Sequence, residues 1–363
     1  MAIKQGSLDI IDDNGKLTNS PALVVRNWYG RETAIVSIEG SSPPAQGVVS
    51  GFVSGGQNDT SPNFQNMISA IQKFSLVSAG NATNVGSLSM AKKECMGYSS
   101  STDGFTGGGS NNPNGGATDL DKRIQKFPFA IAAGPSTDVG FLLPLPNLSL
   151  RTSGSGHSST TDGFTAGGKI PGTPGRITLI DKFPFSIASG TSASVGNLVA
   201  AVQSQAGHSS EVQGFKSGGL GNPATRISSI EKFPFTISSG TATDVGDLSS
   251  VKQSMHGQNS STDGFTTGGF LSPPPTYLTI IDKFPFSITN GVASGVGNLA
   301  SATSSFGSGI SSQIDGFTTG GYSAVAGGRV TDIQKFPFAI AGGTAIDIGD
   351  LTTEINNMAT HQD

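Results

Sequence analysis

The sequence predicts an all-β fold, a six-bladed β-propeller, because three different phrases each recur six times. The first phrase is Lys-Phe-Pro-Phe or a variant of it, with Phe at Phe74, Phe127, Phe183, Phe233, Phe284 and Phe336. The second is Gly-Phe-x-x-Gly-Gly, with Phe at Phe52, Phe105, Phe164, Phe215, Phe265 and Phe317. The third is Val-Gly-x-Leu, which begins at Val85, Val139, Val195, Val245, Val296 and, with Ile in place of Val, at Ile348. A common period of about fifty residues indicates six structural units.

Each unit reads as four short strands, because short apolar runs alternate with clusters of Gly, Pro, Ser and Asn. The alternation of Phe233, Phe235 and Ile237 predicts three large side chains on one face of a strand. Pro234 cannot donate to a strand ladder, so this strand is either an edge strand or ends in a turn there. Four strands in about fifty residues suit a propeller blade, and the absence of 3.6-residue periodicity excludes helical solenoids.

The two ends of the chain predict how the ring closes. The C-terminal residues 351–363 align with residues 248–260, and Met358 falls on Met255. We therefore expect the last strand to pair with the strand at Phe52, which removes an open sheet edge. The propeller would span residues 46–363. Residues 1–45 do not match the repeat; they read as two strands, at 22–25 and 34–38, followed by a linker at 41–44, and form either an attachment arm or a cap.

Composition narrows the functional class. Apolar residues make up 35% of the chain, with 21 Phe, so the chain has a core in spite of its 52 Gly. Charged residues are only 13%, which favours a surface of Ser, Thr and Asn, as in extracellular and virion proteins. The net charge of −4, without a basic stripe, argues against a nucleic-acid partner. No signal peptide or membrane span is visible, so we expect synthesis in a cytoplasm and no membrane insertion.

Two motifs suggest chemistry but have simpler interpretations. The phrase Ser-Ser-Thr-Asp-Gly-Phe at 100–105 is similar to the Asp-box of sialidase propellers, although the Asp-to-Gly spacing differs, and a tight turn explains it better. The histidines His157 and His208 occupy equivalent positions in Gly-His-Ser-Ser, and His256 and His361 fall at or near the same position. Because other units carry Tyr98 and Ile310 there, we expect polar strand-end residues rather than metal ligands.

A lysine precedes the first Phe of every Lys-Phe phrase, including Lys182, Lys232 and Lys283. One interpretation is a solvated face with cross-strand partners, such as Asp162 for Lys182. The other is a ring of cations that binds an anionic glycan. Single Cys95 excludes an intramolecular disulfide, and nucleophile elbows, phosphate loops and paired-carboxylate sites are absent, so we predict no catalytic residues, no metal, no cofactor and no enzymatic activity.

Two resemblances carry the functional expectation. An apolar strand that ends in Gly-Gly, followed by a strand with aromatic residues, resembles the Kelch-type propeller over residues 46–363, although Phe-Pro-Phe replaces the usual Tyr and the third phrase lacks Trp. The tandem phrases Ile-Asp-Lys-Phe-Pro-Phe, Val-Gly-Asp-Leu and Asp-Gly-Phe-Thr-x-Gly-Gly also resemble the propeller repeats of virion proteins in marine and cyanobacterial phages.

That resemblance implies a virion structural protein of the tail or tail-fibre apparatus that contributes to adsorption on the host surface. A head-decoration protein and a carbohydrate-binding lectin-like propeller are the alternatives. The implied partners are other virion proteins, bound through the N-terminal arm in an oligomeric particle, and a glycan or protein of the host surface. Specificity would lie where the units differ, in the loops at 110–119 and 271–276 and in the insertion at 141–146.

Overall fold

The computed structural model describes four strands within residues 1–46, and residues 47–58, 66–111, 121–143, 151–170, 175–271, 276–305, 309–323 and 325–363. The chain divides into two compact units, Met1–Ser42 and Pro43–Asp363. The first contains two antiparallel hairpins, β1 (Ile3–Gln5) with β2 (Leu8–Ile11) and β3 (Leu23–Arg26) with β4 (Glu32–Val36). The second hairpin confirms the two predicted strands, whereas the first has no counterpart in the prediction. The predicted linker at 41–44 lies outside the described residues.

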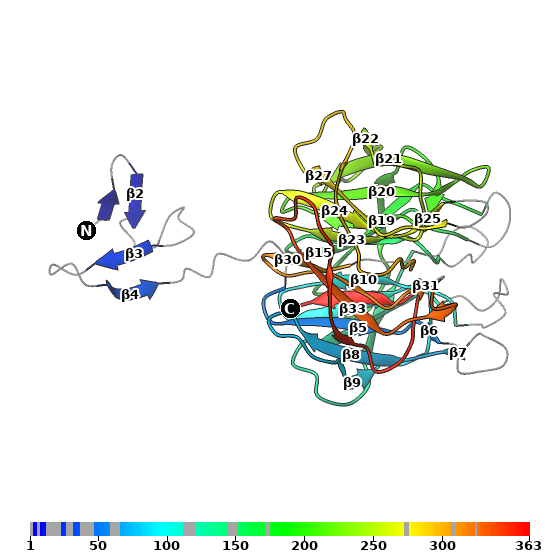
Figure 1. The fold of residues 1–363 in the computed structure, drawn as a ribbon, viewed down its shortest axis with the longest axis horizontal. Helices are drawn as coiled ribbons and strands as arrows, with labels where there is room; N and C mark the ends of the chain where they lie inside the picture. The colour runs from blue at the N-terminus through cyan, green and yellow to red at the C-terminus, as the bar shows by residue number, and fades with distance from the viewer. Residues whose placement is uncertain are drawn as a thin grey trace. The chain divides into compact units, whose positions relative to one another are not determined.

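The second unit is a six-bladed β-propeller, as predicted (Figure 1). From the innermost strand outward, the blades are β35 (Ala359–Gln362), β5 (Ser50–Ser54), β8 (Ala70–Ser75) and β9 (Thr83–Ser87) in blade 1; β10 (Met96–Ser99), β11 (Asp103–Gly107), β12 (Arg123–Pro128) and β13 (Thr137–Phe141) in blade 2; β14 (Ser155–Ser158), β15 (Asp162–Ala166), β16 (Leu179–Pro184) and β17 (Ala193–Asn197) in blade 3; β19 (Ala206–Ser209), β20 (Gln213–Gly221), β21 (Thr225–Pro234) and β22 (Thr243–Asp247) in blade 4; β23 (His256–Asn259), β24 (Asp263–Thr267), β27 (Ile280–Pro285) and β28 (Ser294–Asn298) in blade 5; and β29 (Ile310–Ser311), β30 (Asp315–Thr319), β33 (Asp332–Pro337) and β34 (Ile346–Asp350) in blade 6.

The ring closes as the sequence predicts. The C-terminal strand β35 supplies the innermost strand of blade 1 and pairs antiparallel with β5, with His361 opposite Phe52. Figure 1 shows the red end of the chain beside the blue strand β5. The carboxylate of Asp363 also accepts hydrogen bonds from the backbone N–H groups of Val49 and Ser50, at 3.1 and 2.6 Å. Residues more than 300 positions apart in the sequence therefore complete one sheet.

The Phe-Pro-Phe strand ends in a turn and is not an edge strand. In blade 3, β16 pairs with β15 on one side and β17 on the other, and its last residue is Pro184. The carbonyl of Pro184 then accepts the N–H of Ile187 at 2.9 Å. Only Phe183 of the three alternating apolar residues lies in the strand; Phe185 and Ile187 belong to the turn and pack into the same cluster.

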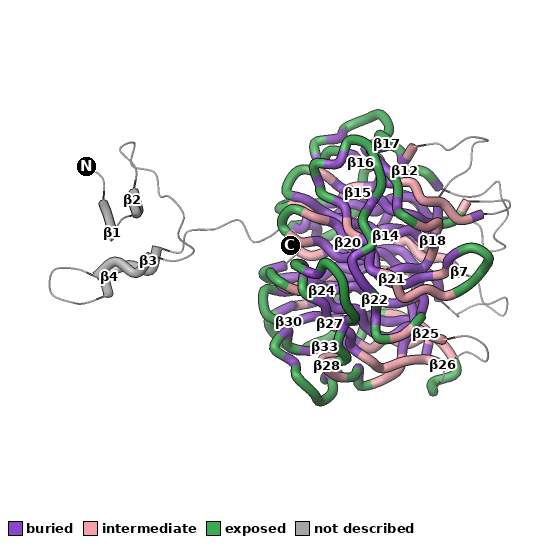
Figure 2. Tube along the Cα trace, turned by 90° about the horizontal axis from the view of Figure 1, so that it is seen from above, coloured by how far each residue is buried: buried purple, intermediate pink, exposed green. Residues whose placement is uncertain are grey.

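The core consists of six clusters, one at each boundary between neighbouring blades. Between blades 3 and 4, Phe164 stacks on Phe235 at a centroid distance of 5.0 Å and meets Phe233 at 5.9 Å. The same stacked pair recurs at four further boundaries. Burial of one Phe side chain stabilises the fold by about 1.5–3 kcal/mol. Figure 2 shows the buried residues mainly along the inner strands of the blades and the exposed ones at the connecting loops and on the outermost strands.

Hydrogen bonds also join the blades at the rim, which accounts for the third phrase. In blade 3, the backbone N–H of Asn197 donates to Gly240 of blade 4 at 2.9 Å, and its carbonyl accepts from Ala242 at 2.7 Å. Equivalent pairs link blades 1 to 2, 2 to 3, 4 to 5 and 5 to 6. The glycine of Val-Gly-x-Leu is required here, because a Cβ on Gly196 would lie 2.6 Å from Ile237 Cδ1 and 2.9 Å from the Gly240 carbonyl.

Candidate functional site

The six innermost strands surround the propeller axis, and a closed ring of hydrogen bonds joins their ends next to the hairpins that lead to the second strands. At this end, each strand has a residue whose side-chain oxygen accepts the backbone N–H of the equivalent residue in the preceding blade. The six bonds are 2.7–3.1 Å long and run from Ser99 to Ser158, Ser158 to Ser209, Ser209 to Asn259, Asn259 to Ser311, Ser311 to Gln362 and Gln362 to Ser99. We call this set the hydroxyl–amide ring.

A second ring closes the other end of the inner strands. Its residues are Glu94, Ser153, Ser204, Ser254, Ser305 and Asn357. Five bonds run from backbone N–H to backbone carbonyl over 2.7–3.0 Å, and the sixth runs from the Asn357 N–H to Ser305 Oγ at 2.9 Å. Five of these residues, all except Ser305, have φ between 54° and 60°. Because left-handed backbone is costly for residues other than glycine, closure of the ring imposes this conformation.

Between the two rings, glycine allows the inner strands to touch. Four of the six inner strands carry glycine at this level, Gly309 directly precedes β29 in blade 6, and Thr360 takes the position in blade 1. A Cβ on Gly207 would lie 2.7 Å from the carbonyl oxygen of Gly156. The centre is therefore packed, and a cavity of about 40 Å³ remains at the mouth bordered by the hydroxyl–amide ring. No Asp, Glu, Lys or Arg side chain lines this cavity.

The predicted strand-end position holds for His256, the first residue of β23, whereas His157, His208 and His361 are buried within the inner strands and connect neighbouring blades. His157 is the third residue of β14, and its Nδ1 lies 3.0 Å from the carbonyl oxygen of His208 in the next blade. A carbonyl only accepts, so Nδ1 carries the proton and Nε2 accepts from Ser155 Oγ at 2.9 Å. The ring also packs edge-on against Phe233 at 5.2 Å. The position of these histidines is determined by contacts between blades, and the sequence pattern of a single strand does not show such contacts.

His208 and His361 repeat this arrangement, with Nδ1 at 3.2 Å from the Gln258 carbonyl and 3.1 Å from the Tyr98 carbonyl. Burial lowers the pKa of His157 to about 4, of His208 to about 3 and of His361 to about 4. His256 lies two residues before that position, at the start of β23, and its pKa is also lowered by burial, to about 4. Within the described ranges, no group of three or more His, Cys, Asp or Glu is placed to hold a metal ion.

Five of the six repeated lysines, all except Lys232, lie over the Phe ring on the second strand of their own blade. Lys182 Nζ is 5.7 Å from the centre of the Phe164 ring and 3.7 Å from Asp162, which confirms the predicted cross-strand partner. Three other lysines have the same partner, in the pairs Lys126–Asp103, Lys283–Asp263 and Lys335–Asp315, at 2.8–3.3 Å. Lys232 instead donates to the Ile288 carbonyl at 3.4 Å. The positive potential available to an anionic glycan is thus reduced at four lysines, and glycan binding stays a prediction.

Sequence reasoning missed the residue just before each lysine, which is buried and polar. It is Asp181, Glu231 or Asp282 in blades 3 to 5 and Gln72, Gln125 or Gln334 in blades 1, 2 and 6. Each carboxylate has a buried cation, in the pairs Asp181–Arg151, Glu231–Lys216 and Asp282–Lys252, at 2.6–3.0 Å. The available signal was the change between acid and amide among the copies. Desolvation lowers the pKa of Lys216 and Lys252, and the partner carboxylates oppose that shift.

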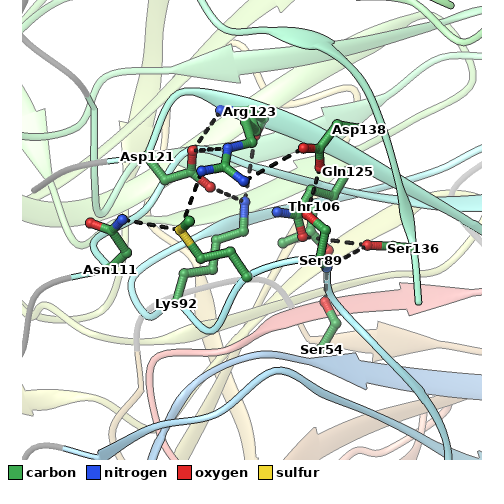
Figure 3. A network of polar contacts seen from close by, with 11 residues as sticks. Ser54, Ser89, Lys92, Thr106, Asn111, Asp121, Arg123, Gln125, Ser136 and Asp138 are labelled. Atoms are coloured by element: carbon green, nitrogen blue, oxygen red, sulfur yellow. Dashed lines mark hydrogen bonds and ion pairs between the residues drawn. The ribbon is translucent and has the colours of Figure 1, made fainter. Parts of the chain in front are cut away.

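The boundary between blades 1 and 2 has a different arrangement of buried charges, within the polar network drawn in Figure 3. Gln125 stands at the acidic position, and the buried Lys92 pairs instead with Asp121 at 3.1 Å. Arg123 reaches both Asp121, at 3.2 Å, and Asp138, at 3.5 Å. The network contains two cations and two carboxylates among these residues, so its charge is balanced. The adjacent loop predicted to carry specificity, 110–119, lies mostly outside the described residues, as do most of 271–276 and part of 141–146.

The Ser-Ser-Thr-Asp-Gly-Phe phrase forms the tight turn that the sequence predicts. Ser100 Oγ accepts the backbone N–H groups of Thr102 and Asp103, at 3.2 and 2.9 Å, and β10 and β11 pair on either side. The turn at 159–162 has the same bonds. These serine and aspartate side chains therefore have a local structural role. The part of the chain that the structure describes holds no helix of the length and hydropathy needed to cross a bilayer.

Comparison with known proteins adds no family to these observations. No protein-family model matches the chain, and no curated protein is significantly similar to it.

Proposed function

We propose that the chain is a non-enzymatic structural protein of a phage virion, in the tail or tail-fibre apparatus, that presents a propeller face to the host surface. One observation carries the proposal beyond the repeat resemblance. Three sets of recurring polar groups join one blade to the next, at the axis, in the buried layer and at the rim. A ring held in this way suits a particle component that must persist outside the cell.

The reactive side chains of the described region support a binding rather than a catalytic role. Cys95 is buried, and desolvation raises the pKa of its thiol to about 11, so the thiolate is a minor species at neutral pH. The inner histidines His157, His208 and His361 use both ring nitrogens within the fold. In the proposal, the unit Met1–Ser42 supplies the attachment to the particle and the propeller supplies the contact with a receptor or a neighbouring subunit.

The test is the protein content of purified particles. Mass spectrometry of intact virions should detect the chain, and immunogold labelling should place it on the tail; labelling confined to the head would favour the head-decoration alternative. A variant lacking residues 1–45 should fold as a propeller and fail to join the particle. A protein that is absent from intact virions contradicts the proposal. Binding on a glycan array with about six sites per chain would favour the lectin-like alternative.

A further inference from the structure

The mouth of the propeller axis has unused hydrogen-bond donors of one kind. In the hydroxyl–amide ring, the oxygens of Ser99, Ser158 and Ser209 each accept a backbone N–H. The same holds for Ser311, which accepts from Asn259. None of these four hydroxyls has an acceptor for its own proton within the described part of the chain. The serines are 0–7% exposed, so bulk water does not readily serve them.

Three of these four donors meet at a single cavity. Ser99, Ser158 and Ser209 line the cavity of about 40 Å³, together with Asn259 and Gln362. A site of that size holds roughly three water molecules or one monatomic ion with part of its shell, since one water needs about 10–15 Å³ on this measure. A hydroxyl that accepts an N–H bond is polarised, and this makes its proton a stronger donor. The arrangement therefore offers several polarised donors to one small acceptor.

The charge of the surroundings favours an anion over a cation. Hard cations in proteins are held mainly by carboxylate and carbonyl oxygens, and no acidic side chain lines the cavity. Four of the hairpins next to the mouth carry an aspartate, Asp103, Asp162, Asp263 or Asp315, and each is paired with a lysine at 2.8–3.7 Å, while the blade 4 hairpin carries the exposed Glu211. From these observations we propose that the axial mouth binds one small monovalent anion of halide size. The site is independent of whichever partner the propeller face contacts.

Bromide tests the site directly. Crystals grown without halide and soaked in sodium bromide should show an anomalous peak on the axis, within hydrogen-bonding distance of Ser158 Oγ and Ser209 Oγ. In solution, sodium bromide should raise Tm more than sodium gluconate at equal ionic strength, because gluconate is too large for the cavity and binding to the folded state stabilises it. An axis occupied by water alone at high bromide concentration overturns the proposal.

Two variants with side chains of similar size test whether the hydrogen-bond donors at Ser158 are needed for anion binding. Blade 5 has Asn259 where blade 3 has Ser158, and the Asn259 side-chain oxygen accepts the Ser209 N–H at 2.9 Å. Both Ser158→Asn and Ser158→Asp should keep the acceptor for the Ser99 N–H. Only Asn also keeps donors, so it should retain the bromide peak, whereas Asp should lose it. Equal loss in both variants contradicts the proposal. Ser249→Ala, at an exposed serine outside the ring, should leave the peak unchanged.

Discussion

At the residue scale, each buried acidic side chain next to a repeated lysine has a buried cationic partner. In blade 6, which has Gln334 in place of the acid, the cation is absent too. The linker position that holds Lys252 before blade 5 holds Thr303 before blade 6, and the facing residue changes from Asp282 to Gln334. Gln334 is satisfied without a cation, since its side-chain oxygen accepts the Ala300 N–H at 2.7 Å. Loss of one partner of a buried pair leaves an uncompensated charge, whereas loss of both does not.

This pairing predicts a specific double-variant result. Lys252→Thr should lower the free energy of unfolding by about 3–5 kcal/mol, because Asp282 would remain buried and charged. Lys252→Thr combined with Asp282→Gln recreates the uncharged combination of blades 5 and 6 and should recover most of that loss. Denaturant unfolding of the wild type, both single variants and the double variant measures the coupling. A double variant no more stable than Lys252→Thr would show that the two side chains do not act as a pair.

The axial glycines make a second prediction at this scale. Gly207→Ala places a Cβ 2.7 Å from the rigid carbonyl of Gly156, so neighbouring strands must separate and the free energy of unfolding should fall by about 2–3 kcal/mol. Gly295→Ala is the control, because Gly295 is exposed and its Cβ would meet only the flexible end of Ile280 at 3.1 Å. Thermal unfolding should show little change there. Similar losses at the two glycines would mean that close approach at the axis is unimportant.

At the element scale, the C-terminal strand is the part on which closure depends. Deletion of residues 359–363 should expose the edge of β5 along Ser50–Ser54. It should also remove the hydrogen bonds that the backbone N–H groups of Val49 and Ser50 donate to Asp363. An open edge in a closed sheet system invites pairing between chains, so we expect aggregation or a large fall in Tm. Size-exclusion chromatography and thermal melting measure this, and a peptide of residues 359–363 supplied in trans should restore a monomer. A truncated chain that stays monomeric with unchanged Tm would contradict the prediction.

The repeat predicted the fold well because its phrases carry both period and packing. Counting Phe127 and its equivalents established six blades, and aligning Met358 with Met255 predicted the closing strand. The buried pairs were missed because Asp282 and Lys252 are thirty positions apart and the acid before each lysine reads as part of a surface motif. Three of the histidines were misplaced because their partners, such as the His208 carbonyl for His157, belong to another blade. Contacts between units are not visible in the pattern of one unit.

At the scale of the whole molecule, four buried neutral histidines make stability depend on pH. Burial lowers the pKa of His157, His256 and His361 to about 4 and that of His208 to about 3, from 6.5 in the unfolded chain. Between pH 6.5 and about 4 the unfolded state therefore binds more protons than the folded state. The free energy of unfolding should be level above about pH 6.5 with respect to these groups and fall as the pH drops below it.

The slope of the free energy of unfolding against pH shows how much each histidine contributes to the acid sensitivity. Each histidine contributes at most about 1.4 kcal/mol per pH unit over this window, because one pKa unit corresponds to that difference. Blade 5 carries Gln258 at the position of His208, and its Nε2 donates to the Phe317 carbonyl at 3.1 Å, so a glutamine is compatible with the inner strand. His208→Gln should reduce the slope by about 1.4 kcal/mol per pH unit between pH 6 and 4.5, measured by denaturant unfolding at several pH values. A slope that is the same in the wild type and the variant would exclude His208 as a source of acid sensitivity and locate that sensitivity outside this blade boundary.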